Sequence, residues 1–134
     1  VHGSRGLGDV YKRQSWFHGI TVLGYRFRRF DPEKALALIT KHQVRNTFLP
    51  PTALKFIRQL PESSSQVQTS LRSIMSAGEP LGAEMLKWGA DCLNVKINEM
   101  YGQTEVNYFI GNCQTLEPAK PGSMGRPYTV IGRL

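Results

Sequence analysis

Alternation between strand-like and helix-like segments is the feature that most constrains the fold of this sequence. Short apolar or β-branched runs occur at residues 19–24, 46–49, 71–77 and 93–98. Amphipathic segments with helical spacing follow each of the first three runs. Parallel strands need a long crossover connection, which is usually a helix. The order therefore predicts an α/β fold with a mainly parallel sheet.

Proline and aspartate mark where the predicted helices begin. Asp31 is suited to accept unpaired N–H groups, and Pro32 suits the first helical position, so a helix should run from there to about residue 42. Pro50 and Pro51 end the second strand, and the apolar spacing behind them predicts another helix. A third helix is expected over residues 81–88, with its apolar residues on one side.

Size and composition are those of one modest domain or part of one. The 134 residues are 40% hydrophobic and 20% charged, and no window holds 18 consecutive apolar residues. We therefore expect a cytoplasmic protein. Cys92 and Cys113 form no metal-spaced pair, and in that compartment we expect both to be reduced and structural.

Basic residues exceed acidic ones, with a net charge of +7. They are scattered apart from Arg26, Arg28 and Arg29, which favours a solvated face or a rim for phosphate ligands over a nucleic-acid groove. We expect no nucleic-acid partner. A non-catalytic basic binding module is the alternative function class.

Residues 1–14 have no hydrophobic periodicity and contain three glycines. The run over residues 6–14 resembles translated linker sequence found at the ends of reading frames assembled from environmental DNA. We expect residues 1–14 to be an appended, non-native linker, with a genuine flexible tail as the alternative.

The turns that follow the strands are the first place to look for chemistry, because ligands of open parallel sheets bind beyond the carboxyl ends of the strands. Behind the third predicted strand, Gly78 would let a ligand approach the backbone, and Glu79 offers acceptors for an amino or hydroxyl group. Taken alone, Gly-Glu-Pro is more often a simple turn that leads into a helix.

The segment 99–105 carries a denser set of polar groups. Tyr101 is suited to stack on a base, Gln103 and Thr104 to bond a phosphate oxygen, and Glu105 to bind Mg²⁺ through oxygen. The alternative is a capped turn, with Thr104 as the N-cap of a short helix and Glu105 in its first turn. The residue types leave both interpretations open.

Taken in series, the motifs resemble the adenylate-forming superfamily of acyl-CoA synthetases, acyl ligases and peptide-synthetase adenylation domains. The resemblance covers residues 19–128 and is greatest to bacterial short- to medium-chain acyl-CoA synthetases. The motifs that carry it lie at residues 26–32, 49–54, 78–80, 101–105 and 121–127. Another adenylate-forming ligase is the alternative within the superfamily.

This resemblance implies a role for each matching position. The ATP- and AMP-binding residues would be Gly78, Glu79, Pro80, Glu99, Met100, Tyr101, Gly102, Gln103 and Thr104. Within this set Glu99 would face the adenine edge and Thr104 would bond the α-phosphate. Thr104 and Glu105 would be catalytic, with Glu105 holding Mg²⁺. In the family reaction a carboxylate attacks ATP to give acyl-AMP, and the thiol of coenzyme A then displaces AMP.

The resemblance also bears on substrate and domain limits. Acetyl-specific relatives have a tryptophan where this chain has Gly102, so we expect an open acyl pocket that includes Ala77 and a substrate longer than acetate. The family's phosphate loop, ribose-binding aspartate and C-terminal domain are missing. We therefore expect residues 15–134 to be a central fragment of the large N-terminal domain, inactive alone, with residues 129–134 departing from the family pattern.

Overall fold

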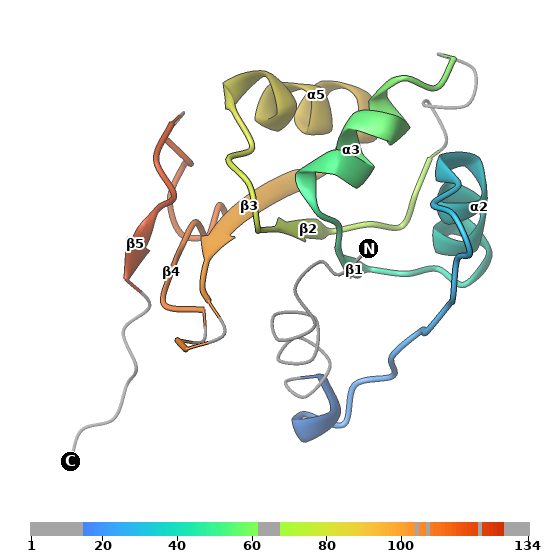
Figure 1. Cartoon of the computed structure of the whole chain (residues 1–134), viewed down its shortest axis with the longest axis horizontal. Coiled ribbons are helices and arrows are strands. Elements are labelled where there is room, and N and C mark those ends of the chain that lie inside the picture. The colour runs from blue at the N-terminus through green and yellow to red at the C-terminus, as the bar shows by residue number, and fades with distance from the viewer. Residues whose placement is uncertain (1–14, 62–67, 104, 107, 121, 128–134) are drawn as a thin grey trace.

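A five-stranded sheet forms the centre of the chain (Figure 1). The computed structural model describes residues 15–61, 68–103, 105–106, 108–120 and 122–127. The first three strands pair in parallel, and the last two continue the sheet in antiparallel pairing. The α/β prediction is confirmed, and the parallel part consists of the three longer strands. The strands, in both chain and sheet order, are β1 (Asn46–Phe48), β2 (Ser73–Ser76), β3 (Lys96–Tyr101), β4 (Ile110–Gly111) and β5 (Arg126–Pro127).

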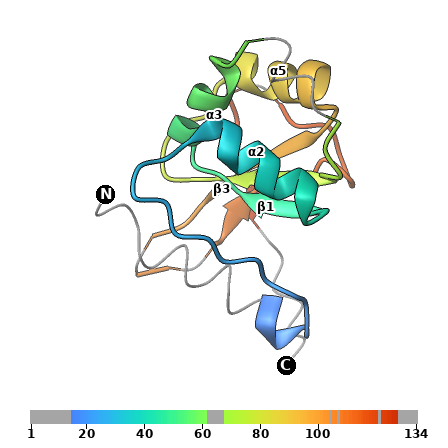
Figure 2. The ribbon, with the colours of Figure 1, turned by 90° about the vertical axis from the view of Figure 1, so that its right-hand side faces the viewer.

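Three helices lie on one side of this sheet (Figures 1 and 2). They are α2 (Pro32–Lys41), α3 (Pro51–Arg58) and α5 (Ala83–Leu93). Helix α3 links β1 to β2, and α5 links β2 to β3. Two successive crossovers of the same hand between adjacent strands place both helices on the same face. In the described part of the chain, no helix is long and apolar enough to cross a membrane.

The predicted starts of the first two helices are confirmed, whereas the third helix, predicted over residues 81–88, begins at Ala83 and extends to Leu93. The Asp31 carboxylate accepts the backbone N–H of Lys34 at 3.0 Å, and Pro32 occupies the first turn of α2, which has His42 as its C-cap. Pro51 begins α3, which has no side-chain cap. Its start depends instead on the fixed φ of proline, which needs no N–H partner at that position.

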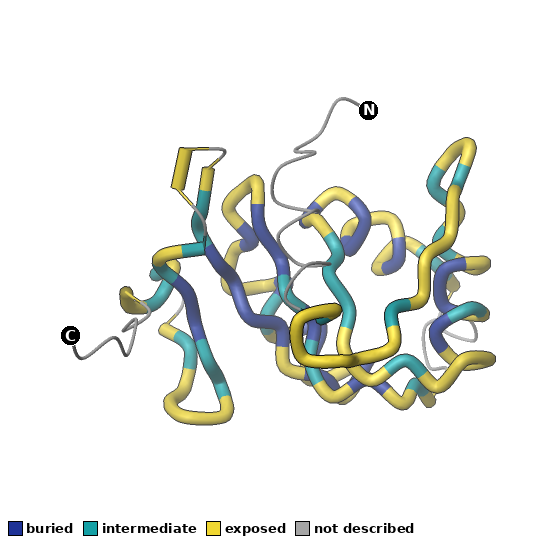
Figure 3. Tube along the Cα trace, turned by 90° about the horizontal axis from the view of Figure 1, so that it is seen from below, coloured by how far each residue is buried: buried dark blue, intermediate teal, exposed yellow. Residues whose placement is uncertain are grey.

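The core lies between the helix layer and the sheet. Ile74 of β2, Ile97 of β3 and Leu54 of α3 are each 0% exposed, and Met85 and Trp88 of α5 pack into the same cluster. Figure 3 shows the buried residues concentrated along the central strands. Burial of these side chains is the main force that holds helices to sheet.

The predicted buried strand over residues 19–24 is wrong. These residues form no strand, and Ile20 and Leu23 are 57% and 46% exposed. A strand needs a partner for its backbone groups, and no strand of the described sheet pairs with this segment. Instead, aromatic contacts join the segment to the helices through Tyr25, Phe27, Phe30 and Phe56, with successive ring centroids 4.7, 5.6 and 6.3 Å apart.

The side chain of Lys34 reinforces the same attachment from helix α2. Its ammonium lies 5.1 Å from the centroid of the Tyr25 ring. A side-chain hydrogen bond with Tyr25 is the main cause that raises the pKa of Lys34 above its ordinary value.

The fourth strand differs from its prediction over residues 93–98. Leu93 still belongs to α5, and Asn94 takes a left-handed conformation, with φ of 49°, that ends the helix. Strand β3 therefore begins only at Lys96 and extends to Tyr101. It is also buried on both faces rather than half-buried, because four consecutive residues, 97–100, are buried.

Close packing of α5 on β3 depends on Gly89. A Cβ atom at this position would lie 2.5 Å from Cδ1 of Ile97. Gly89→Ala should therefore lower the free energy of unfolding by about 1–3 kcal/mol, although alanine is the better helix former. In an Ile97→Val background the contact with Cδ1 is lost and only that with Cγ1, 2.7 Å from the added Cβ, remains, so the loss should shrink. Equal losses in both backgrounds, measured by urea unfolding, would contradict this account.

Candidate functional site

Two predicted motifs lie side by side at one edge of the sheet. Strands β2 and β3 pair in parallel with Ser76 opposite Glu99. The Gly78 turn therefore leaves β2 beside the point where β3 continues into Tyr101 and Gly102. Carboxyl ends of parallel strands are where open α/β sheets bind ligands. The tertiary structure thus brings together two segments that are about twenty residues apart in the sequence.

The turn over residues 78–80 has an open surface. Gly78 has φ of +101°, a conformation that side chains rarely adopt, so the backbone itself requires glycine. A Cβ atom built there would meet nothing within 4 Å. Gly78, Glu79 and Pro80 are all exposed. This backbone is therefore accessible to a ligand.

Hydrogen bonds hold this turn on both sides, and we call residues 78–80 the clamped turn. The hydroxyl of Thr52 donates to Oε1 of Glu79 at 3.2 Å. The backbone N–H of Leu81 donates to Oε1 of Glu99 at 3.1 Å. One bond joins the turn to α3, and the other joins it to β3.

Thr52 is a site residue that the sequence analysis missed. It lies in the first turn of α3, directly behind the carboxyl end of β1. The strand-end rule that singled out Gly78 and Tyr101 also applies to this turn. The signal was therefore present in the predicted strand over residues 46–49.

Several predicted site residues lie inside the protein. Glu99 is 7% exposed, Met100 5% and Ala77 4%. Ser76 is fully buried, and its hydroxyl has no hydrogen-bond partner among the described residues. The first half of the run over residues 99–105 is therefore part of the central strand rather than of a free loop.

The second half of that run turns back toward the strand. Tyr101 and Gly102 are half-buried, and the amide of Gln103 donates to the Tyr101 hydroxyl. The backbone N–H of Gln103 donates to the carbonyl of Val106 at 2.8 Å. Gln103 and Glu105 are exposed. An aromatic ring at the end of β3 is thus followed by an exposed amide and an exposed carboxylate.

The predicted roles of Thr104, including that of N-cap, fall on a residue outside those described. The described residues 105, 106 and 108 form bends rather than a helix. The linker predicted over residues 1–14 and the doubtful segment 129–134 likewise lie outside the described residues.

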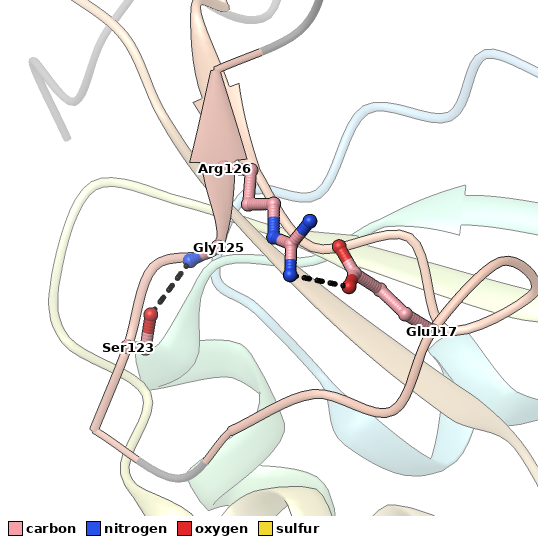
Figure 4. Close-up of polar contacts among 4 residues, drawn as sticks. All are labelled: Glu117, Ser123, Gly125 and Arg126. Atoms are coloured by element: carbon pink, nitrogen blue, oxygen red, sulfur yellow. Dashed lines mark hydrogen bonds and ion pairs between the residues drawn. The ribbon is translucent and has the colours of Figure 1, made fainter.

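Residues 122–127 form no helix, as expected for the Gly- and Pro-rich segment (Figure 4). The hydroxyl of Ser123 accepts the N–H of Gly125 at 3.2 Å, and Arg126 forms an ion pair with Glu117 at 3.1 Å. Arg126 and Pro127 pair with β4 as β5, which the sequence analysis did not predict. This segment forms the edge of the sheet next to β4.

Beyond the end of β3, the carboxylate of Glu105 is suited to bind a metal ion. Among the described residues, no group of three or more His, Cys, Asp or Glu side chains is arranged to hold an ion. Mg²⁺ is commonly bound through one or two carboxylates together with substrate phosphates. The exposed Glu105 fits that kind of shared site.

The fold and these residues define an α/β domain of the kind in which ligands bind where parallel strands end. The sequence pattern of the family described as AMP-binding enzyme matches residues 14–132. The chain belongs to this family.

Similar proteins carry related names. The chain is 37% identical over 111 residues to 4-hydroxybutyrate–CoA ligase 1 of Metallosphaera sedula, a match that covers 82% of the chain and 19% of the relative. It is 33% identical over 127 residues to the mitochondrial acyl-coenzyme A synthetase ACSM4 of Homo sapiens, covering 92% of the chain and 21% of the relative. The chain thus spans about a fifth of the length of these relatives.

Solved structures show the same architecture. The acyl-CoA synthetase of Brucella canis superposes with a TM-score of 0.69 at 34% identity, over 74% of this chain and 19% of that one. The N-terminal domain of FACL13 from Mycobacterium tuberculosis superposes with a TM-score of 0.72 at 26% identity, over 84% of this chain and 28% of that one. The described sheet is therefore part of an N-terminal domain of the acyl-CoA synthetase type.

Packing of the loop before β5 depends on Gly125. It has φ of +99°, and a Cβ atom there would overlap the Gly111 carbonyl of β4. Gly122 has a comparable φ of +78° but open space around its Cβ position. Gly125→Ala should therefore lower the unfolding free energy by roughly 2 kcal/mol more than Gly122→Ala, because only Gly125→Ala adds a clash to the backbone strain. Similar thermal unfolding of the two variants would contradict this expectation.

Proposed function

We propose that the chain forms part of the adenylate site of an ATP-dependent acyl-CoA synthetase. The observation that carries this proposal is the position of the clamped turn beside Tyr101 at the carboxyl edge of β2 and β3. The family match and the names of the relatives support the same class. A bacterial short- to medium-chain enzyme of fatty acid metabolism is the particular form that we propose, with cytoplasmic location.

The proposed roles divide between the two motifs. Gly78, Glu79 and Pro80 line the pocket for adenine and ribose, since their backbone and carboxylate are exposed. Tyr101 packs against the base, and Gly102 lies at the acyl pocket together with Ala77. The remaining nucleotide-binding assignments are Glu99, Met100, Gln103 and Thr104.

Glu105 is the residue that we propose as the carboxylate ligand of Mg²⁺. The bound ion would neutralise phosphate charge. The exposed position of Glu105 next to the proposed phosphate-binding residues Gln103 and Thr104 suits a site shared with phosphate oxygens.

The contribution of this segment to catalysis is positioning. ATP, coenzyme A and a small carboxylic acid are the proposed substrates. The carboxylate attacks the α-phosphorus with release of pyrophosphate, and the coenzyme A thiol then attacks the acyl carbonyl with release of AMP. Fixed hydrogen-bond donors and a fixed position of the adenine ring keep the reacting atoms aligned in both steps.

Binding of an acyl-AMP analogue to the 134-residue chain tests the proposal. Removal of an acceptor for ribose or base should weaken affinity, so Glu79→Ala is expected to raise Kd about tenfold. Glu84→Ala is the matched control, because Glu84 is an exposed glutamate of α5 that forms an ion pair with Arg58. Its affinity should equal that of the unchanged chain in isothermal titration calorimetry.

A titration with duplex DNA distinguishes the enzyme proposal from the alternative, a non-catalytic basic binding module. Salt-sensitive DNA affinity without binding of the acyl-AMP analogue would favour the basic binding module and contradict the enzyme proposal.

The length of the acyl group is tested at Gly102. A bulky side chain there should shorten the pocket, so Gly102→Trp in the synthetase that carries this chain should lower kcat/KM for hexanoate relative to acetate by about tenfold or more. Competition between the two acids measures this ratio directly. An unchanged preference for hexanoate over acetate would contradict the assignment of Gly102 to the acyl pocket.

A further inference from the structure

We propose that Arg45 and Arg72 form a binding site for a phosphate group at the amino edge of the parallel strands. Each arginine directly precedes its strand, β1 or β2, and both are exposed. The Gly78 turn leaves the opposite end of β2, and the extended chain between Arg72 and this turn spans about 20 Å. The site is therefore separate from the proposed adenylate edge, and it does not depend on the proposed function.

Hydrogen bonds between two chain segments fix the backbone that carries the arginines. The N–H of Arg72 donates to the carbonyl of Arg45 at 2.6 Å, and the hydroxyl of Ser70 donates to the carbonyl of Val44 at 3.1 Å. These bonds continue the pairing of β1 with β2 beyond the ends of the strands. The two arginines therefore lie side by side, at about the 5 Å spacing of neighbouring strands.

The side chains of the two arginines leave the same face of the sheet. Asn46 and Ser73, the next residues of the two segments, are paired in register, and the Ser73 hydroxyl donates to Oδ1 of Asn46 at 3.1 Å. These two side chains therefore share one face. Because successive side chains of an extended chain alternate between faces, those of Arg45 and Arg72 share the other.

No described carboxylate neutralises this pair. The ion pairs found among the described residues involve other arginines. Asp91 is the acidic residue in the last turns of the helices that lead into the parallel strands, and it pairs with neither Arg45 nor Arg72. Like charges side by side on neighbouring strands repel each other and lower stability. A bound anion would remove that repulsion.

A phosphate group fits the pair better than a single carboxylate does. A guanidinium presents its N–H donors in a planar fork that matches the oxygens of a phosphate. A phosphate monoester carries about two negative charges and has enough oxygens to accept from both forks. A carboxylate has a single charge and only two oxygens. The charge and the number of acceptors therefore favour a phosphate group.

Titration of the 134-residue chain with inorganic phosphate at constant ionic strength tests the site. The NMR signals of the Arg45 and Arg72 side-chain N–H groups should shift and saturate, with a Kd of about 1 mM. Arg45→Gln and Arg72→Gln should each raise Kd about threefold, and the double variant about tenfold, because exposed charge pairs contribute modestly. Lys55→Gln/Lys87→Gln is the matched control, since it removes the same charge from exposed positions of α3 and α5. Its Kd should stay within about twofold of the unchanged chain.

Thermal unfolding gives a second readout. A ligand that binds only the folded state stabilises that state, so phosphate should raise the Tm of the unchanged chain. The same addition should leave the Tm of Arg45→Gln/Arg72→Gln almost unchanged.

Equal rises in Kd in the double arginine and double lysine variants would show general charge attraction and overturn the site. NMR shifts that do not saturate would overturn it as well, and so would equal rises in Tm with and without the two arginines. Acetate that binds as tightly as phosphate would overturn the assignment to a phosphate group. If the double arginine variant does not fold, the single variants decide, with Lys55→Gln as their control.

Discussion

Parallel strands cannot be joined by a tight hairpin, and this constraint determines most of the structure. The pairs β1–β2 and β2–β3 each require a crossover, provided by α3 and α5 on one face. The same pairing places the carboxyl ends of β1, β2 and β3 at one edge. Core burial, helix placement and the position of the site therefore all depend on the parallel register.

Burial of β3 on both faces determines how much of the site is rigid. Glu99 and Met100 belong to the most covered strand, while Gln103 and Glu105 lie beyond its end in exposed positions. The polar run over residues 99–105 is thus divided into a buried half within β3 and an exposed half beyond it. The buried half holds the neighbouring turn by a hydrogen bond, and the exposed half faces the ligand in the proposed function.

Three elements meet at the clamped turn, and this convergence gives the site its geometry. Thr52 reaches it from α3, Glu99 from β3, and the turn itself continues β2. A turn with φ of +101° at Gly78 has few alternative backbone states once both sides are bonded. Such preorganisation lowers the conformational cost of binding a ligand.

The sequence by itself determined the order of the elements from α2 to β3 and the location of the motifs. Asp31, Pro32 and the proline pair before α3 mark helix starts through local chemistry, which needs no distant partner. Whether residues 19–24 form a strand, and how deeply Glu99 is buried, was decided only by the tertiary structure. The physical reason is that strand pairing and burial depend on residues far along the chain, whereas caps and turns depend on neighbours.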